Sequence, residues 1–189
     1  MTVEATEPTT RDPGGEPVSR LAAIVFDRDK APDEALVAFA DAAISRGARV
    51  AGLVQERADD DRCDLHDVRV RDLMSGEILP IMQDLGAGST GCAVDPAAIA
   101  EAARLLDRAL STNPDLLVVN RFGRLESDGG GMLNEIGRAF AEGVAMIVCV
   151  PGRYREAWNA FAAGLDQQLP ARREAIEAWW RAISRGACL

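Results

Sequence analysis

The sequence predicts an α/β fold, a three-layer sandwich in which helices cover both faces of a mostly parallel sheet. The first observation is that short apolar segments such as Leu21–Phe26, Leu116–Val119 and Val144–Val150 have no polar face. Strands of this kind are typical of parallel sheets that are buried on both sides and joined by right-handed crossovers. The second observation is that these segments alternate with longer ones whose apolar residues recur at helical spacing.

The predicted elements follow one another along the chain as strand and helix. Helical spacing predicts helices over 32–46, 95–111, 132–142, 156–164 and 172–184, and a further strand is predicted over 49–55. The helix at 95 begins with Asp95-Pro96, a capping side chain followed by the residue preferred at the first helical position. Ser75-Gly76 separates two strand-like segments, 69–74 and 77–81, which predicts a small β-hairpin insertion.

The chain is expected to fold as a single domain. It has 189 residues, of which 48% are hydrophobic, and this suffices to close one core. We place the domain at residues 21–187. Residues 1–20 are rich in Thr, Pro, Glu and Gly and are expected to form a disordered tail.

The overall charge excludes several classes of partner. A formal net charge of −9 disfavours binding to phosphate backbones, so we expect no nucleic acid partner and a local pocket for any anion. The longest apolar segments are shorter than the roughly 20 residues that cross a bilayer. The first 20 residues lack the apolar core of a secretory signal. We therefore expect no membrane insertion and a cytoplasmic location, where the four cysteines would stay reduced.

The most informative segment is a glycine-rich loop at 83–92. Its candidate ligand-binding residues are Gly86, Gly88, Ser89, Thr90, Gly91 and Cys92. Glycines let backbone N–H groups converge and the two hydroxyls add donors, so together they predict a nest for a tetrahedral oxyanion. The segment is not a Walker A motif, because it lacks the terminal Gly-Lys-Ser/Thr. The alternative is a flexible surface turn without a ligand.

A second candidate follows the predicted strand 116–119, at the edge where parallel sheets bind ligands. It comprises Asn120, Arg121, Phe122, Gly123, Arg124 and Glu126. The planar guanidinium groups of Arg121 and Arg124 suit an oxyanion, and Glu126 could orient an arginine or a water molecule. The alternative is a solvated loop in which one of the arginines pairs with Glu126.

Two further segments bear on metal and nucleotide binding. Cys63 and His66 are ligand types that zinc accepts, but they supply at most half of a tetrahedral shell; the alternative is a polar loop with an incidental histidine. The connection 26–32 lies where a Walker A loop would stand, yet it contains no glycine, and Lys30 is followed by Ala31 rather than by Ser or Thr. Nucleotide hydrolysis in the usual manner is therefore not expected.

Several of these segments together resemble a bacterial family described as NTPase-like, with a degenerate P-loop. The resemblance rests on Gln55-Glu56-Arg57, Arg62-Cys63-Asp64, the glycine-rich loop and Asn120-Arg121-Phe122-Gly123-Arg124, and it covers Leu21–Leu169. It implies a P-loop-NTPase-like fold. Because members are often encoded beside molybdate-transport genes, it also implies a link to that transport system. Asn120 and Arg121 stand where P-loop enzymes carry acidic residues, which puts magnesium binding in doubt.

The residues and the resemblance lead to three hypotheses. The first is a non-catalytic protein that binds a small anion, molybdate or tungstate, for molybdenum uptake, storage or homeostasis. It expects a homo-oligomer, no flavin or nicotinamide, and no magnesium nucleotide. The alternative is an atypical nucleotide-binding protein, or a nucleoside triphosphatase with a degenerate phosphate loop. The third is a regulatory domain whose tryptophan-bearing helices, 156–164 and 172–184, dock a partner or a second copy.

Overall fold

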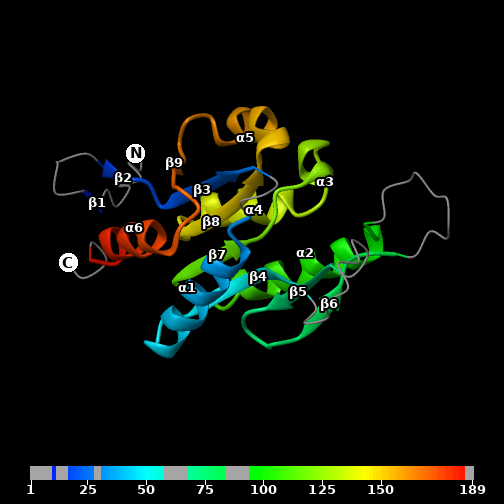
Figure 1. The fold of residues 1–189 in the computed structure, drawn as a ribbon, viewed down its shortest axis with the longest axis horizontal. Helices are drawn as coiled ribbons and strands as arrows, with labels where there is room; N and C mark the ends of the chain where they lie inside the picture. Colours follow the sequence, from blue (N-terminus) through cyan, green and yellow to red (C-terminus); the bar gives the residue numbers. More distant parts are fainter. Residues whose placement is uncertain (1–9, 12–16, 28–30, 58–67, 84–93, 186–189) are drawn as a thin grey trace, which may run out of the picture.

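The computed structural model describes residues 10–11, 17–27, 31–57, 68–83 and 94–185. Its strands are β1 (Thr10–Arg11), β2 (Pro17–Val18), β3 (Leu21–Phe26), β4 (Val50–Arg57), β5 (Val68–Asp72), β6 (Ile78–Pro80), β7 (Leu116–Val119), β8 (Met146–Pro151) and β9 (Gln167–Gln168) (Figure 1). Its helices are α1 (Asp33–Ser45), α2 (Pro96–Leu110), α3 (Arg124–Ser127), α4 (Leu133–Ala141), the 3-10 turn η2 (Gly152–Tyr154), α5 (Arg155–Ala162) and α6 (Arg173–Arg185).

Seven of these strands form one mostly parallel sheet in the order β6-β5-β4-β7-β8-β3-β9. The pairs β4 with β7, β7 with β8, β8 with β3 and β3 with β9 are all parallel. The predicted hairpin is present as β5 and β6, and it joins the sheet antiparallel to β4. The predicted fold class is therefore confirmed.

Two apolar cores lie on opposite faces of the sheet and define the three layers. On one face, side chains of α2, α4 and α5, among them Leu106, Ile136 and Trp158, pack against the strands. On the other face, α1 and α6 contribute Leu36, Phe39 and other apolar side chains. Figure 1 shows α1 and α6 together on the same side of the sheet. Tryptophans of the last two helices belong largely to these cores, since Trp158 and Trp179 are buried.

The segment 17–20 departs from the predicted disordered tail. Pro17–Val18 pairs antiparallel with Thr10–Arg11, and Val18 is buried in the core beside α6. Trp179 Nε1 donates to the carbonyl oxygen of Ser19 at 2.8 Å, and Arg20 Nε donates to that of Gly143 at 2.8 Å. These contacts attach the segment before Leu21 to the domain.

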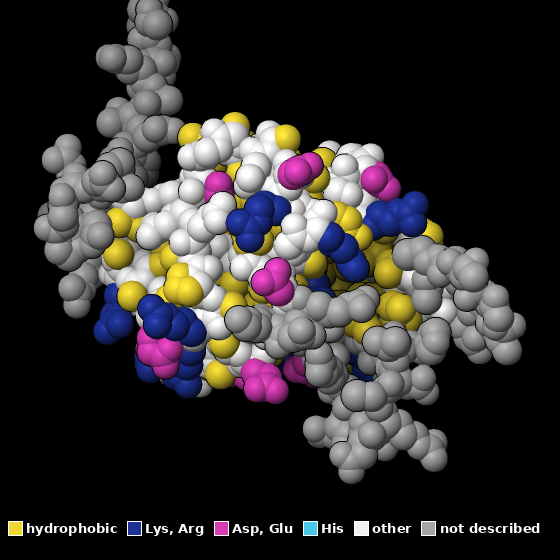
Figure 2. Space-filling view, turned by 45° about the horizontal axis from the view of Figure 1, so that its top comes forward, with side chains coloured by type: hydrophobic (Ala, Val, Ile, Leu, Met, Phe, Trp, Pro, Cys, Tyr) yellow, Lys and Arg dark blue, Asp and Glu magenta, His cyan; other side chains and the backbone are white. Residues whose placement is uncertain are grey.

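The surface in Figure 2 carries acidic and basic side chains in small, alternating groups. On the described part of this face, the arginines do not merge into one continuous basic surface. Among the helices that the structure describes, none has the length and apolar content to cross a membrane.

The topology singles out the carboxyl end of β3 and β8. The connection from β3 runs through α1 on one face of the sheet, whereas the connection from β8 runs through α5 on the other. Where neighbouring parallel strands send their connections to opposite faces, a crevice opens at their carboxyl ends, and ligands of open α/β sheets bind there. Any functional polar group is therefore expected near Asp27, Asp33, Asn120 and Gly152.

Candidate functional site

A polar cluster at this carboxyl edge joins the first turn of α1 to the loop that follows β7. Asn120 Nδ2 donates to Asp33 Oδ1 at 2.9 Å. Arg121 Nη2 donates to Asp33 Oδ2 at 2.8 Å, so each carboxylate oxygen accepts one side-chain hydrogen bond. The cluster brings together residues 87 and 88 positions apart in the sequence.

Asp33 and Asn120 are buried, so the charge of the carboxylate needs compensation within the cluster. Asn120 exposes 2% of its surface and Asp33 exposes 9%, and they are two of the four buried polar residues that the structure describes. A buried carboxylate is tolerated when a cation and hydrogen-bond donors compensate its charge. Here Arg121 is the cation and Asn120 is a donor. Removing one partner would leave the other buried without compensation.

Two atoms of the cluster have no partner among the described residues. Asn120 Oδ1 and Arg121 Nε are both buried and neither forms a hydrogen bond. An unpaired buried polar group costs about 1–3 kcal/mol. In native proteins such groups call for an explanation, and a ligand or an ordered water that pairs them is the usual one. The edge of the sheet thus offers one free acceptor and one free donor.

The guanidinium group of Arg121 is held from a second side by an aromatic ring. Its central carbon lies 5.1 Å from the centre of the Phe26 ring, within the range of a cation–π contact. Phe26 is the last residue of β3, so the ring comes from the strand that precedes α1. Arg121 retains 28% exposure of its side chain and can be reached from solvent.

The charges of the cluster also act on the thiol of Cys149, which lies in β8. Burial raises the pKa of its thiol well above the usual range, the Asp33 carboxylate raises it further, and Arg121 acts in the opposite direction. The thiol is therefore protonated and unreactive at neutral pH. Cys149 is a buried core residue of β8.

Glu126 has a structural position inside its own loop. Its Oε2 accepts from the backbone N–H of Gly123 at 2.7 Å, and its Oε1 accepts from that of Met132 at 3.0 Å. Gly131 makes room for this carboxylate, because a β-carbon there would lie 2.1 Å from Glu126 Oε1. Both oxygens are thus engaged by backbone amides, and Glu126 ties α3 to the start of α4.

Phe122 and Arg124 also lie away from the cluster. The Phe122 ring is buried and meets Trp158 edge-on, with 5.4 Å between ring centres. Arg124 is exposed over 67% of its side chain and pairs with Asp128 at 3.5 Å. Of the six residues predicted in this segment, the structure therefore brings only Asn120 and Arg121 to Asp33.

The other predicted site residues lie outside the described residues. This applies to the loop residues Gly86, Gly88, Ser89, Thr90, Gly91 and Cys92, and to Cys63 and His66. The ends of the glycine-rich segment are close, since Met82 and Val94 form an antiparallel bridge and Gln83 Nε2 donates to the Val94 carbonyl at 3.1 Å. Across the described ranges, no three His, Cys, Asp or Glu side chains gather as metal ligands.

Asp33 is the site residue that sequence reasoning missed. In the sequence, Asp33 is one of two acidic residues in the first turn of a helix. Acidic residues are common there, because the helix dipole stabilises a negative charge at the amino-terminal end. The available signal was its place after the first strand of a parallel sheet, on the side of the expected crevice. That signal does not distinguish Asp33 from Glu34, which is exposed.

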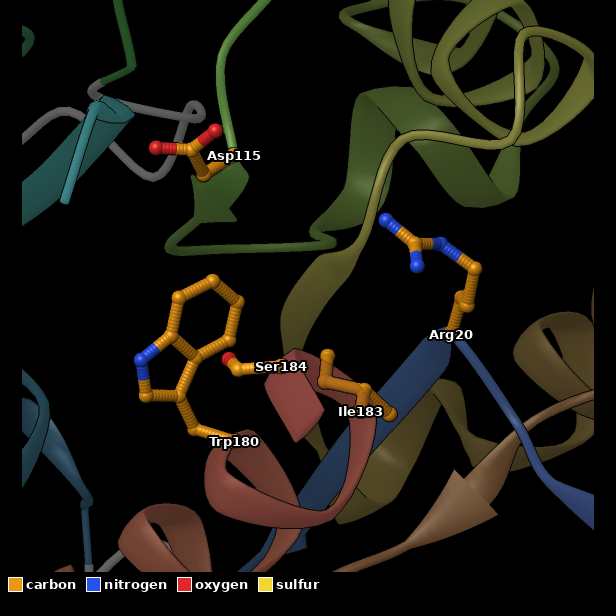
Figure 3. Close-up of a pocket in the computed structure, with 5 residues that line it drawn as sticks. All are labelled: Arg20, Asp115, Trp180, Ile183 and Ser184. Carbon is orange, nitrogen blue, oxygen red and sulfur yellow. The ribbon is translucent and has the colours of Figure 1, made fainter. Parts of the chain in front are cut away.

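A separate cavity of about 270 Å³ lies at the opposite, amino edge of the sheet. Figure 3 shows Arg20 and Asp115, which precede β3 and β7, and three residues of α6: Trp180, Ile183 and Ser184. Asp115 is already paired with Arg49 at 2.7 Å. This cavity is at the far end of the strands from the Asp33 cluster and belongs to a different part of the molecule.

Comparison with known proteins places the chain in a family and a fold. Residues 21–179 match the family described as a protein of unknown function, DUF2478. The chain is 34% identical over 166 residues to the molybdenum import ATP-binding protein ModC 2 of Bradyrhizobium diazoefficiens. That match covers 88% of this chain and 18% of the relative, so the chain spans less than a fifth of that protein's length.

Two solved structures share the architecture. THEP1 from the hyperthermophile Aquifex aeolicus superposes with a TM-score of 0.60 at 13% identity, over 86% of this chain and 95% of that one. A human cancer-related nucleoside triphosphatase superposes with a TM-score of 0.57 at 14% identity, over 90% and 98%. The predicted NTPase-like fold is therefore confirmed, and at these identities the likeness concerns the fold alone.

The ligand prediction, however, is wrong. We expected molybdate or tungstate and no magnesium nucleotide. The curated relative is named as an ATP-binding protein, and one structural neighbour is named as a nucleoside triphosphatase.

Proposed function

This chain belongs to the DUF2478 family, and on that premise we propose that it is a nucleotide-binding domain. The proposed ligand site is the carboxyl edge of β3, β7 and β8, where Asp33, Asn120 and Arg121 meet. The proposed ligand is a nucleoside di- or triphosphate with its magnesium ion. Arg121 would contact a phosphate group, since a guanidinium fork matches phosphate oxygens.

The unpaired atoms of the buried cluster are the observation that carries this proposal. Asn120 Oδ1 and Arg121 Nε are buried without a partner among the described residues. They lie at the topological switch point, where open α/β sheets bind ligands. A nucleotide offers both acceptors, on its phosphates, and donors, on its sugar hydroxyls, its base or the waters of its metal ion. It therefore has the chemistry to pair one free donor and one free acceptor.

We propose binding rather than hydrolysis as the activity of this site. Glu126 was the candidate for positioning a water, but both of its oxygens accept backbone hydrogen bonds. Releasing either oxygen would leave an amide unpaired, at a cost of about 1–3 kcal/mol. The connection after β3 also lacks the glycines that let a phosphate approach the backbone. Both features support a role in sensing or holding a nucleotide.

The experiment is a titration of purified protein with ATP, GTP and ADP, each with and without magnesium, followed by calorimetry and by the melting temperature. A ligand that binds only the folded state stabilises it by about 2.7 kcal/mol at a concentration 100-fold above Kd. Arg121→Gln should abolish the heat of binding. Arg124→Gln removes a neighbouring arginine that is exposed and paired with Asp128, and this control should leave the heat of binding unchanged.

Two results would count against this function. Absence of binding by all three nucleotides, with and without magnesium, would remove it. Release of phosphate from ATP by the wild-type protein, lost in Arg121→Gln and retained in Arg124→Gln, would keep the site but replace binding with hydrolysis.

We also propose that the chain works together with a molybdenum importer. The support is its 34% identity to a protein named for molybdenum import, of which it spans 18%. Deletion of the gene in its host should lower cellular molybdenum at limiting molybdate, as measured by elemental mass spectrometry, and the intact gene should restore it. An unchanged molybdenum content would contradict this link without bearing on nucleotide binding.

A further inference from the structure

The anion-binding groups at the carboxyl edge are already occupied by a carboxylate of the chain itself. Asp33 lies in the first turn of α1, a helix of 13 residues whose amino-terminal end attracts negative charge. One oxygen accepts from Asn120 and the other from Arg121. Helix end, cation and amide donor thus converge on Asp33, as they would on a bound phosphate.

This arrangement opposes the binding of a second anion. A phosphate in contact with Arg121 would lie next to the Asp33 carboxylate, and like charges at such distances repel strongly in a partly buried site. Arg121 cannot escape this conflict by a small shift, because the Phe26 ring lies against its guanidinium group. Asp33 must therefore move before a phosphate can bind in its place.

The present pairing is also incomplete, which leaves room for a second arrangement. Asn120 is 2% exposed, yet its Oδ1 has no partner among the residues described, and neither has Arg121 Nε. If Asp33 withdraws, both side chains are released to turn their unpaired atoms toward a ligand. A state with a bound ligand can thus satisfy groups that the pairing with Asp33 does not.

We infer that Asp33 is an internal anion that holds Asn120 and Arg121 in the free protein and is displaced by a phosphate group of the nucleotide. Asp33 then determines the affinity of the site: it keeps the two groups in place and excludes weakly binding anions such as inorganic phosphate. The inference rests on the proposed function, because it concerns the same site and the same class of ligand.

The test compares two substitutions that each remove one negative charge from the first turn of α1. Asp33→Asn removes the carboxylate that pairs with Arg121. Glu34→Gln removes its exposed neighbour and serves as the matched control for net charge and helix dipole. Calorimetric titration with ATP should show that Asp33→Asn binds at least about tenfold more tightly than wild type. Glu34→Gln should stay within about twofold.

A second variant and a second ligand guard against indirect effects. Asp33→Ser keeps a residue suited to a helix start without its charge, and should also tighten binding if Asp33→Asn does not fold. Inorganic pyrophosphate should bind to the uncharged variants more tightly than to wild type, since it has no base or sugar to contact elsewhere. Circular dichroism and the melting temperature establish that each variant is folded.

The outcomes separate this inference from the proposed function. Equal or weaker binding of ATP by a folded Asp33→Asn overturns the inference, and weaker binding only when magnesium is present identifies Asp33 as a metal ligand instead. Binding by Asp33→Asn but not by wild type supports the internal anion and removes the proposed function of the native chain. Absence of binding by every variant removes both.

Discussion

The side chain of Asn120 donates a hydrogen bond of 2.9 Å to the carboxylate of Asp33 and so ties the end of β7 to the first turn of α1. The two residues follow strands that are not neighbours, because β8 lies between β7 and β3. The bond therefore spans the carboxyl end of β8 and joins α1 to the loop that follows β7. This hydrogen bond predicts how a change of side chain at position 120 alters the stability of the fold.

Asn120→Asp should destabilise the fold by about 3 kcal/mol at pH 7, since it replaces a donor with a second carboxylate facing Asp33 in a buried site. In the folded variant the two carboxylates would lie so close that they share a proton, whereas in the unfolded chain both are ionised at pH 7. Because the folded state then holds more protons, stability relative to wild type should recover as the pH falls from 7 toward 5.

Urea unfolding at several pH values measures this effect. Asn159→Asp is the matched control, because Asn159 is exposed on α5, and this variant should follow the wild-type curve. An Asn120→Asp variant as stable as wild type at pH 7 would show that Asn120 does not compensate the Asp33 carboxylate.

Gly131→Ala should be more destabilising than Gly129→Ala. Both glycines have positive φ, +60° and +87°, so both substitutions carry the cost of about 1–2 kcal/mol for a left-handed L-residue. Only at Gly131 would the new β-carbon also displace Glu126 from its backbone partners, whereas it meets nothing within 4 Å at Gly129. We expect an additional loss of about 1–3 kcal/mol in denaturant unfolding. Equal losses at the two positions would contradict a structural role for Glu126.

Asp115 should make the fold weakly sensitive to acid. A side-chain hydrogen bond from Arg49 holds the pKa of Asp115 below its ordinary value, with the Arg49 backbone N–H adding to the effect against partial burial. A carboxyl with a lowered pKa in the folded state stabilises the fold above its unfolded pKa, and this contribution is lost as the pH falls through the lower value.

The difference in urea midpoint between wild type and Asp115→Asn should therefore be constant above about pH 5 and shrink below about pH 4. The pair is partly exposed, so the difference should be small and should decrease further in high salt. A difference that grows in acid would have the wrong sign for this pair.

Cys149 should resist alkylation in the native protein. Burial raises the pKa of its thiol, with the Asp33 carboxylate acting in the same direction, so the reactive thiolate is absent at pH 8. Iodoacetamide should modify Cys149 only in urea, as read from the peptide that contains it by mass spectrometry. Modification of the native protein at the rate seen in urea would show that β8 opens readily or that the thiol is accessible.

Most helices and strands could be predicted because their burial is a local pattern. The uniformly apolar segments at 21–26 and 116–119 are strands, and Asp95 caps α2 through a 2.8 Å bond to the Ala97 N–H as its sequence indicates. The elements not predicted, β1, β2, α3, η2 and β9, are only two to four residues long. Such short elements carry too few residues to show a periodicity, and their neighbours decide their conformation.

Residues 84–92 of the glycine-rich loop stay a prediction, because they lie outside the described residues. Asn120 and Arg121 could be found from their position after an apolar strand, since the rule for parallel sheets needs only the order of elements. Phe122, Arg124 and Glu126 share that position, but the loop turns them toward the core, the solvent and their own backbone.

By itself, the sequence determined the α/β class, the alternation of strand and helix, and the edge of the sheet at which Asn120 and Arg121 lie. Hydrophobic periodicity contains this information, because it reports which face of each element is buried. Only the tertiary structure decided that Asp33 pairs with Asn120 and Arg121 across 87 and 88 residues, and that Glu126 binds its own loop. Side-chain pairing depends on strand order and on distances of a few ångströms, which arise from the packing of the whole domain and leave no local pattern in the chain.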